Sequence, residues 1–146
     1  MPYRNKIYIC FDADEDMNYY NTLKMWAANK NIDFDFNNAH DLTRIFAFNE
    51  ENIKRHLRER IKNSKLMIVL IGEKTKNLYK YVRWEMELAL NMDIPIIAVN
   101  INGKNGIDKE LCPAILKDKL VVHVPFKKDA ILNAMENWPS YYDNSK

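Results

Sequence analysis

Short apolar segments alternate with amphipathic segments along the chain, and this alternation limits the possible folds more than any other feature of the sequence. Residues 66–71 (LMIVLI) and 94–101 (IPIIAVNI) are continuous apolar runs, which are typical of strands buried on both faces of a sheet. Residues 50–63 place apolar side chains at helical spacing, with charged side chains between them. Alternation of strands and helices predicts a parallel sheet that has helices on both of its faces.

The complete pattern predicts five strands and five helices. The predicted strands are residues 6–11, 32–36, 66–71, 94–101 and 120–124, and the predicted helices are residues 15–30, 50–63, 79–92, 109–117 and 127–138. Residues 37–49 are predicted to form a loop, and residues 139–146 a frayed C-terminal tail. This order favours an α/β flavodoxin-like three-layer sandwich with a five-stranded parallel sheet in the order 2-1-3-4-5.

Length and composition limit the class of protein. The chain has 146 residues, so we predict a single domain over residues 1–146, with its core at about residues 5–138. A net charge of +2 gives no strong overall attraction to nucleic acid or to an anionic membrane. No apolar stretch approaches the roughly 20 residues of a membrane-spanning helix, and the N-terminus lacks the apolar run of a signal peptide. The two cysteines fit free thiols better than a disulfide, so we expect a cytoplasmic protein.

Glycine is scarce in this chain. There are three glycines, Gly72, Gly103 and Gly106, in 146 residues, where an average composition has roughly 7%. No two of them can belong to a G-x-G-x-x-G loop or to a P-loop, which are the two common glycine-rich ways of binding phosphate. If the protein handles a nucleotide, it must hold the phosphates in another way.

In a sheet of the predicted topology, ligands bind beyond the carboxyl ends of the strands, near the first and third strands. Two loops are placed there, at residues 11–16 (FDADED) and 72–77. The acidic residues of the first loop suit helix capping, with Asp14 or Asp16 as the capping residue, or the Mg²⁺ cluster of a phospho-receiver. A receiver needs a phosphoacceptor aspartate at the end of the third strand, where this chain has Gly72, so the receiver interpretation is disfavoured.

The helix predicted at residues 79–92 carries a glutamate in the middle of its apolar side. At about 100° per residue, Glu85 shares that side with apolar residues, whereas Arg83 and Glu87 lie opposite, four residues apart, as a solvated pair would. Burial of an unpaired carboxylate is costly or raises its pKa. Glu85 is therefore a structural carboxylate paired with an arginine or lysine, a surface group on a slightly rotated helix, or a catalytic group in a pocket. The spacing leaves these interpretations open.

Three weaker features complete the survey. Residues 54–62 (KRHLRERIK) are predicted to be a solvated helix face. Phe46 and Phe48 could stack on a base or be buried locally, and the sequence does not distinguish these outcomes. The three histidines are scattered and show no zinc-ligand spacing, so we expect no metal.

Three motifs together resemble the TIR-like domain of bacterial Thoeris antiphage defence proteins, the ThsB family. They are Phe-Asp at residues 11–12, IKRHLRERIKNSKLMIVLIGEKT at residues 53–75, and YVRWE at residues 81–85 followed by Leu88 and Ala89. The resemblance covers roughly residues 5–125 and is most specific over residues 66–89.

The resemblance implies an activity as well as a fold. Many TIR-like domains cleave the N-glycosidic bond between the nicotinamide and ribose of NAD, with an essential glutamate on the helix after the third strand. That position is Glu85 in this chain. Thoeris members make an ADP-ribose-derived signal, such as a cyclic ADP-ribose isomer or a conjugate, that activates a partner effector. The family often has Ser, His or Tyr after the first strand, whereas this chain has Asp12, Ala13 and Asp14.

On this resemblance NAD is a substrate and no cofactor is expected. Nicotinamide is already a cationic leaving group, and a carboxylate near the ribose stabilises the oxocarbenium-like sugar that its departure leaves. The expected substrate-binding residues are Phe11, Asp12, His40, Lys74 and Thr75. The expected partners are NAD, further copies of the chain, an effector reached through the nucleotide signal, and an activator of phage origin.

Two alternative functions stay open at this point. A nucleoside deoxyribosyltransferase-like enzyme would also use a glutamate on an N-glycosidic bond, but its glycine-containing motifs are absent here. A non-catalytic TIR-type adaptor would only associate with other TIR surfaces, and Glu85 would be dispensable for that role.

Overall fold

The sheet is the centre of the molecule. The computed structural model describes residues 6–37, 39–47, 49–78 and 80–145, and its five strands are arranged in the order β2-β1-β3-β4-β5. The strands are β1 (Lys6–Cys10), β2 (Asp33–Asp35), β3 (Leu66–Ile71), β4 (Ile96–Asn100) and β5 (Val121–Pro125). All four strand pairings are parallel. The predicted α/β flavodoxin-like topology is confirmed.

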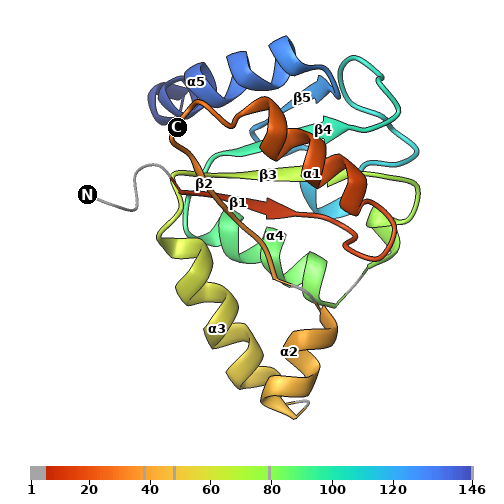
Figure 1. The fold of residues 1–146 in the computed structure, drawn as a ribbon, viewed down its shortest axis with the longest axis vertical. Helices are drawn as coiled ribbons and strands as arrows, with labels where there is room; N and C mark the ends of the chain where they lie inside the picture. The colour runs from red at the N-terminus through yellow and green to blue at the C-terminus, as the bar shows by residue number, and fades with distance from the viewer. Residues whose placement is uncertain (1–5, 38, 48, 79, 146) are drawn as a thin grey trace.

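Helices cover both faces of the sheet, as Figure 1 shows. The helices are α1 (Met17–Trp26), α2 (Ala39–Phe46), α3 (Glu50–Lys62), α4 (Tyr81–Asn91) and α5 (Lys128–Ser145), with two short 3-10 turns, η2 (Thr75–Asn77) and η3 (Ala114–Leu116). Residues of α1 and α5 share one apolar core, and residues of α2, α3 and α4 share the core on the other face. Within the described part of the chain, no helix combines the length and the apolarity needed to cross a bilayer.

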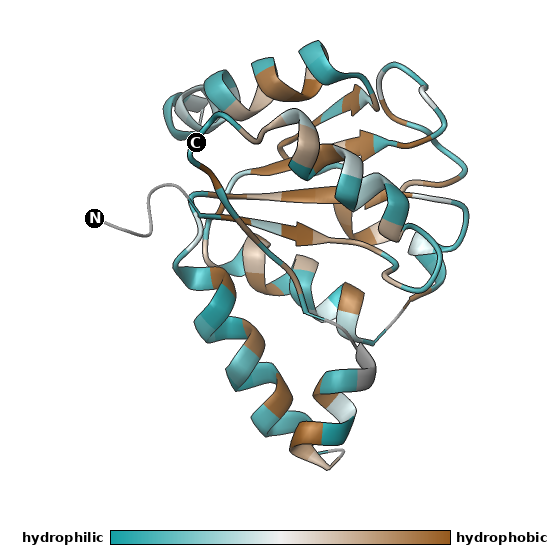
Figure 2. Ribbon diagram, viewed as in Figure 1, coloured by the Kyte–Doolittle hydropathy of each residue, from teal (hydrophilic) through white to brown (hydrophobic). Residues whose placement is uncertain are grey.

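Successive residues of β1 belong to different cores because side chains alternate across a strand. Tyr8 and Cys10 lie in the core under α3 and α4, whereas Ile7 and Ile9 lie in the core under α1 and α5. All six residues of β3 are buried, and the central strands appear as a hydrophobic band in Figure 2. The alternation in β1 decides which of its side chains can reach α4.

The loop predicted at residues 37–49 is wrong, because this segment contains the helix α2. Leu42, which is 3% exposed, and Phe46, one turn later, pack against the core on the α3 and α4 face. The helix has eight residues, too few to be stable without tertiary packing. Its other large apolar residue, Ile45, is 62% exposed, so the apolar pattern in the sequence is weak. Phe48 lies outside the described residues.

The tail predicted at residues 139–146 is also wrong, because α5 continues to Ser145 with Pro139 inside it. A proline removes one helical N–H donor and normally breaks a helix. Here Tyr142 is buried, and its hydroxyl donates a hydrogen bond to the Asp93 carboxylate at 3.2 Å. This tertiary contact holds the last turns of α5 on the molecule; Lys146 lies outside the described residues.

Smaller differences have local causes. The helix predicted at residues 109–117 shrinks to η3, because the Asp108 carboxylate accepts hydrogen bonds from the backbone N–H groups of Glu110 and Leu111 at 3.0 and 3.1 Å and organises a turn. The edge strand predicted at residues 32–36 is only the three residues of β2. Tyr79, the first residue of one predicted helix, lies outside the described residues.

The packing of α2 gives a matched pair of substitutions. Leu42→Ala should lower the free energy of unfolding by about 2–3 kcal/mol because it removes a buried side chain, whereas Ile45→Ala should change it by less than about 0.5 kcal/mol. Urea unfolding followed by circular dichroism measures both values. Equal effects of the two substitutions would show that α2 does not dock on the core in solution.

Candidate functional site

Glu85 lies on the inward side of α4, and this orientation confirms the helical-wheel prediction. The side chain is 3% exposed, and the buried residues Val82, Met86 and Ala89 surround it on the same helix. Glu87 is solvated instead, and it accepts a hydrogen bond from Arg83 Nε at 3.0 Å. The two glutamates of the W-E-M-E segment therefore have different environments.

The partners of the Glu85 carboxylate come from β1. The Tyr8 hydroxyl donates a hydrogen bond to Oε2, and the Cys10 thiol lies 3.6 Å from Oε1 as the second donor. Among the described residues, no arginine or lysine forms an ion pair with Glu85. The carboxylate is held by neutral donors, and not by the basic partner that the structural interpretation required.

This environment changes the ionisation of Glu85. Burial raises its pKa from 4.5 to about 8, although the hydrogen bonds from Tyr8 and Cys10 oppose the change and the Asp35 carboxylate adds to it. The pKa values of Tyr8 and Cys10 are raised well above their ordinary values, because both groups are buried beside Glu85. Both partners therefore stay protonated as donors, while Glu85 can change charge near neutral pH.

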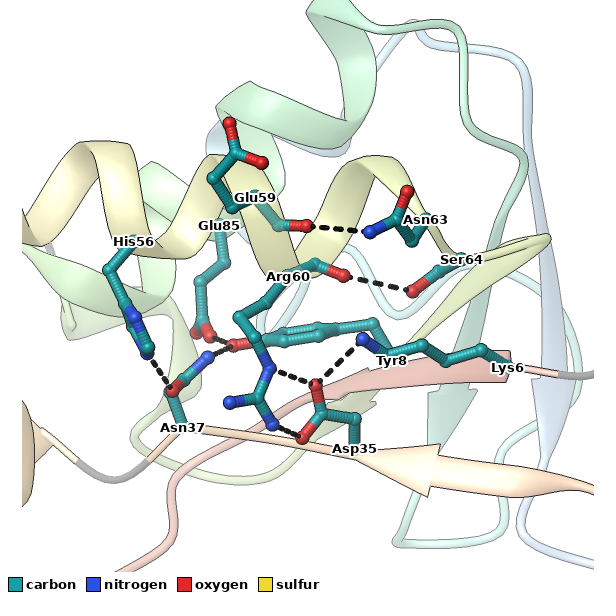
Figure 3. A network of polar contacts seen from close by, with 10 residues as sticks. All are labelled: Lys6, Tyr8, Asp35, Asn37, His56, Glu59, Arg60, Asn63, Ser64 and Glu85. Atoms are coloured by element: carbon teal, nitrogen blue, oxygen red, sulfur yellow. Dashed lines mark hydrogen bonds and ion pairs between the residues drawn. The ribbon is translucent and has the colours of Figure 1, made fainter. Parts of the chain in front are cut away.

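The Tyr8 hydroxyl connects Glu85 to a longer series of hydrogen bonds, drawn in Figure 3. Asn37, two residues beyond β2, donates from Nδ2 to the Tyr8 oxygen at 2.8 Å. The Oδ1 atom of Asn37 lies 3.1 Å from Nε2 of His56, which is on α3. His56 is half-buried, and its ring packs against Phe46 of α2 with 5.2 Å between centroids.

A second group of charges lies beside this series (Figure 3). Asp35 of β2 accepts a hydrogen bond from Arg60 Nε at 2.8 Å, makes a second contact with the same guanidinium, and pairs with Lys6 at 3.3 Å. The prediction of a solvated face at residues 54–62 is therefore only partly correct. Arg55 and Arg58 are exposed, whereas His56 and Arg60 turn toward the end of β2.

Two of the predicted substrate-binding residues, Phe11 and Asp12, directly follow β1 in the chain. Phe11 lies in the core on the opposite face of the sheet and stacks on Tyr20 at 5.2 Å. Asp12 is buried and accepts a hydrogen bond from the Asp14 backbone N–H at 3.2 Å. Neither residue has a hydrogen bond to Glu85 in the described part of the chain, so their roles stay predictions.

Among the described residues, Lys74 and Thr75 also have no hydrogen bond to Glu85. Lys74 pairs with Glu15 at 3.2 Å on the surface. Thr75 is buried and joins the backbone after β3 through hydrogen bonds with Leu70 and Gly72. His40 belongs to α2, and its side chain lies outside what the structure describes.

A separate acidic cavity of about 230 Å³ lies where β3 ends, lined by Glu15, Asp16, Glu73 and Lys74 among others. Burial, together with the neighbouring carboxylates, raises the pKa of Asp16 to about 6. Gly72 also borders this cavity, and a Cβ atom there would lie 2.4 Å from the Asp16 carboxylate, so a larger residue would require the Asp16 side chain to move. Within the described ranges, no three acidic, cysteine or histidine side chains are placed to hold a metal ion.

Sequence reasoning missed Tyr8, Cys10, Asn37 and His56. The first two carried a weak signal, because they alternate with Ile7 and Ile9 and therefore point to one face of a buried strand. Asn37 and His56 carried none, because only the packing of α3 against the end of β2 brings them together.

The fold and the buried glutamate fit a TIR-like protein, because the parallel β2-β1-β3-β4-β5 sheet is followed, after β3, by a helix that carries a buried carboxyl group. The sequence model of the family described as Thoeris protein ThsB, TIR-like domain, matches residues 8–106. The chain therefore belongs to the ThsB TIR-like family. The matched residues begin at Tyr8 and include Asn37, His56 and Glu85, so the whole hydrogen-bond series lies within them.

The buried carboxylate gives a prediction about stability and pH. The pKa of Glu85 is higher in the folded chain than its ordinary value of 4.5, so the folded state binds more protons than the unfolded state between pH 4.5 and about 8. Stability contributed by the protonated group is complete below pH 4.5 and is lost as the pH rises toward 8. Glu85→Gln removes this loss.

The melting temperature of Glu85→Gln should therefore rise relative to that of the wild type as the pH increases from 5 to 8. Scanning calorimetry of both proteins in matched buffers measures the difference. Glu87→Gln on the exposed side of α4 is the control. A constant difference between Glu85→Gln and the wild type across this range would contradict a raised pKa.

Proposed function

We propose that the protein is a NAD-processing TIR-like enzyme of antiphage defence that cleaves the bond between nicotinamide and ribose, with Glu85 as the catalytic residue. Its product would be an ADP-ribose-derived signal, a cyclic ADP-ribose isomer or a conjugate, that activates a partner effector. The family membership supports a role in Thoeris defence. The cleavage reaction, the signal, the effector and a cytoplasmic location are parts of this proposal.

The observation that carries the proposal is the state of Glu85. A purely structural carboxylate at this depth would be expected to have a basic partner, yet the donors to Glu85 are a tyrosine and a cysteine. Because no cation neutralises Glu85, its ionised form, which becomes populated as the pH approaches about 8, can act on a positively charged reaction partner. The oxocarbenium-like ribose formed during glycosidic cleavage is such a partner.

The proposed chemistry assigns one role to each group. The C–N bond to nicotinamide breaks with its electron pair moving to the nicotinamide ring nitrogen, so no proton transfer to the leaving group is needed. The Glu85 carboxylate faces the cationic sugar and stabilises it. Water, the adenine ring or another nucleophile then attacks the sugar carbon, and exclusion of water favours the cyclic or conjugated product over hydrolysis.

Access is the condition for this reaction. With 3% of Glu85 exposed, a substrate can meet the carboxylate only after neighbouring side chains move. Asn37 contacts the Tyr8 hydroxyl, and Leu42 and Phe46 of α2 pack on the same core as Tyr8. Self-association, or an activator produced during phage infection, could supply the energy that opens the site.

Nicotinamide release from NAD tests the proposal with a matched pair of substitutions on one helix. The wild type, alone or with lysate from phage-infected cells, should release nicotinamide. Glu85→Gln should reduce the rate by about 100-fold or more, whereas Glu87→Gln should retain the wild-type rate because its position is exposed. Chromatography with mass spectrometry measures the nicotinamide and identifies the product.

Each negative result has a distinct meaning. Absence of nicotinamide release by the wild type under both conditions would contradict the enzymatic function and favour the adaptor. Equal rates for the wild type and Glu85→Gln would contradict the assignment of the residue alone.

In the wild type, the rate of the chemical step should rise with pH toward about 8, because the carboxylate must be ionised to stabilise the sugar.

A further inference from the structure

The hydrogen bonds that lead away from Glu85 have a direction. A tyrosine hydroxyl has a single hydrogen, and an ionised carboxylate can only accept, so when Glu85 is ionised the Tyr8 hydroxyl donates to it. The Tyr8 oxygen then accepts from Asn37, whose Nδ2 atom lies 2.8 Å from it. The Oδ1 atom of Asn37 is consequently the atom that faces His56, at 3.1 Å from Nε2.

This direction fixes the tautomer of His56. A side-chain amide oxygen is only an acceptor, so Nε2 of His56 must carry a hydrogen to satisfy the contact with Asn37. The series therefore runs from His56 on α3, through Asn37 after β2 and Tyr8 on β1, to Glu85 on α4. Figure 3 shows the four side chains converging from separate segments of the chain.

The opposite direction suits a protonated Glu85. In that state the Glu85 carboxyl group could donate a hydrogen bond to the Tyr8 oxygen, and the Tyr8 hydroxyl could donate to Oδ1 of an Asn37 amide turned by 180°. The Nδ2 atom of that amide could then donate to an unprotonated Nε2 atom of His56. A donor at His56 excludes this arrangement, because two hydrogens would meet at one contact. The direction of the series is thus coupled to the charge of Glu85.

We propose that Asn37 and His56 are positioning residues for Glu85: they hold the Tyr8 hydroxyl with its hydrogen turned to the carboxylate and so favour the ionised form. This inference rests on the proposed function, because it assigns these residues a role in the same reaction. His56 keeps its own place through ring contact with Phe46, and α3 is fixed beside β2 by the contacts of Arg60 with Asp35.

Other ionisable groups also influence the charge of Glu85, and the substitutions proposed below do not change these groups. Tyr8 and Cys10 contact Glu85 from β1, the charge of Asp35 on β2 acts on Glu85 at longer range, and the charge of Arg60 on α3 acts on His56. On α2, Asp41 and Arg44 are exposed and pair with each other at 3.5 Å. The substitutions therefore change the donor to Tyr8 or the donor to Asn37, and leave these groups in place.

Three substitutions distinguish an effect of hydrogen-bond direction from an effect of side-chain packing. Asn37→Asp keeps the shape of the side chain but replaces the donor to Tyr8 with an acceptor that competes for the tyrosine hydrogen. His56→Leu removes the donor to Asn37, whereas His56→Gln supplies a new N–H donor in its place. Asn29→Asp makes the same charge change at an exposed position and is the matched control.

The pKa of Glu85, measured from the ¹³C chemical shift of its carboxyl carbon, tests the inference without depending on activity. Asn37→Asp and His56→Leu should raise this pKa by about one unit, whereas His56→Gln and Asn29→Asp should leave it near the wild-type value. An unchanged pKa in both Asn37→Asp and His56→Leu would overturn the inference. Equal pKa values of Glu85 in His56→Gln and His56→Leu would also overturn it, because loss of the histidine ring from the packing would then explain the change. If Asn37→Asp does not fold, the two His56 variants still decide the outcome.

Kinetics connect the inference to the reaction. If the wild type releases nicotinamide, Asn37→Asp and His56→Leu should lower kcat by about tenfold, change KM less, and move the rise of kcat to higher pH, while His56→Gln restores most of the rate. A higher KM with an unchanged kcat in these two variants would overturn the role in positioning, because the residues would then act on substrate binding alone. If the wild type releases no nicotinamide while the pKa pattern holds, the proposed function fails, and the control of Glu85 ionisation by Asn37 and His56 stands.

Discussion

A carboxylate buried between a helix and a sheet is unfavourable unless hydrogen-bond donors replace the water that it loses. In this protein the donors are the hydroxyl of Tyr8 and the thiol of Cys10, and both depend on the alternation of side chains along β1. Displacement of β1 by one residue would place Ile7 and Ile9 under α4 and leave the Glu85 carboxylate without donors. The register of β1 therefore determines whether the site exists.

Periodicity in the sequence was sufficient for most of the fold. The continuous apolar run of β3 and the strict alternation of elements predicted the sheet and its order, because burial on both faces demands such runs. The two elements that were missed, α2 and the end of α5, are held by few contacts between distant residues. Leu42 and Tyr142 supply these contacts, and nothing adjacent to them in the sequence indicates their partners.

The same distinction applies to the site. Glu85 was found because its position on a helix can be calculated from the helical period, and the structure places it on the inward side as expected. The partners Asn37 and His56 lie 19 residues apart and meet only through the packing of α3 on β2. The topology rule directs attention to the loops that follow the strands, and so to Asp12 and Lys74. The hydrogen bond that Glu85 accepts comes instead from Tyr8, in the middle of β1.

The sheet also separates the core around Glu85 from the core under α1 and α5. The matched family sequence ends at residue 106, before β5 and α5, and α5 packs on the face opposite Glu85. The fully buried β3 lies between the two cores. Substitutions on the outer side of α5 can therefore change one side of the protein while the hydrogen bonds around Glu85 on the other side of the sheet stay in place.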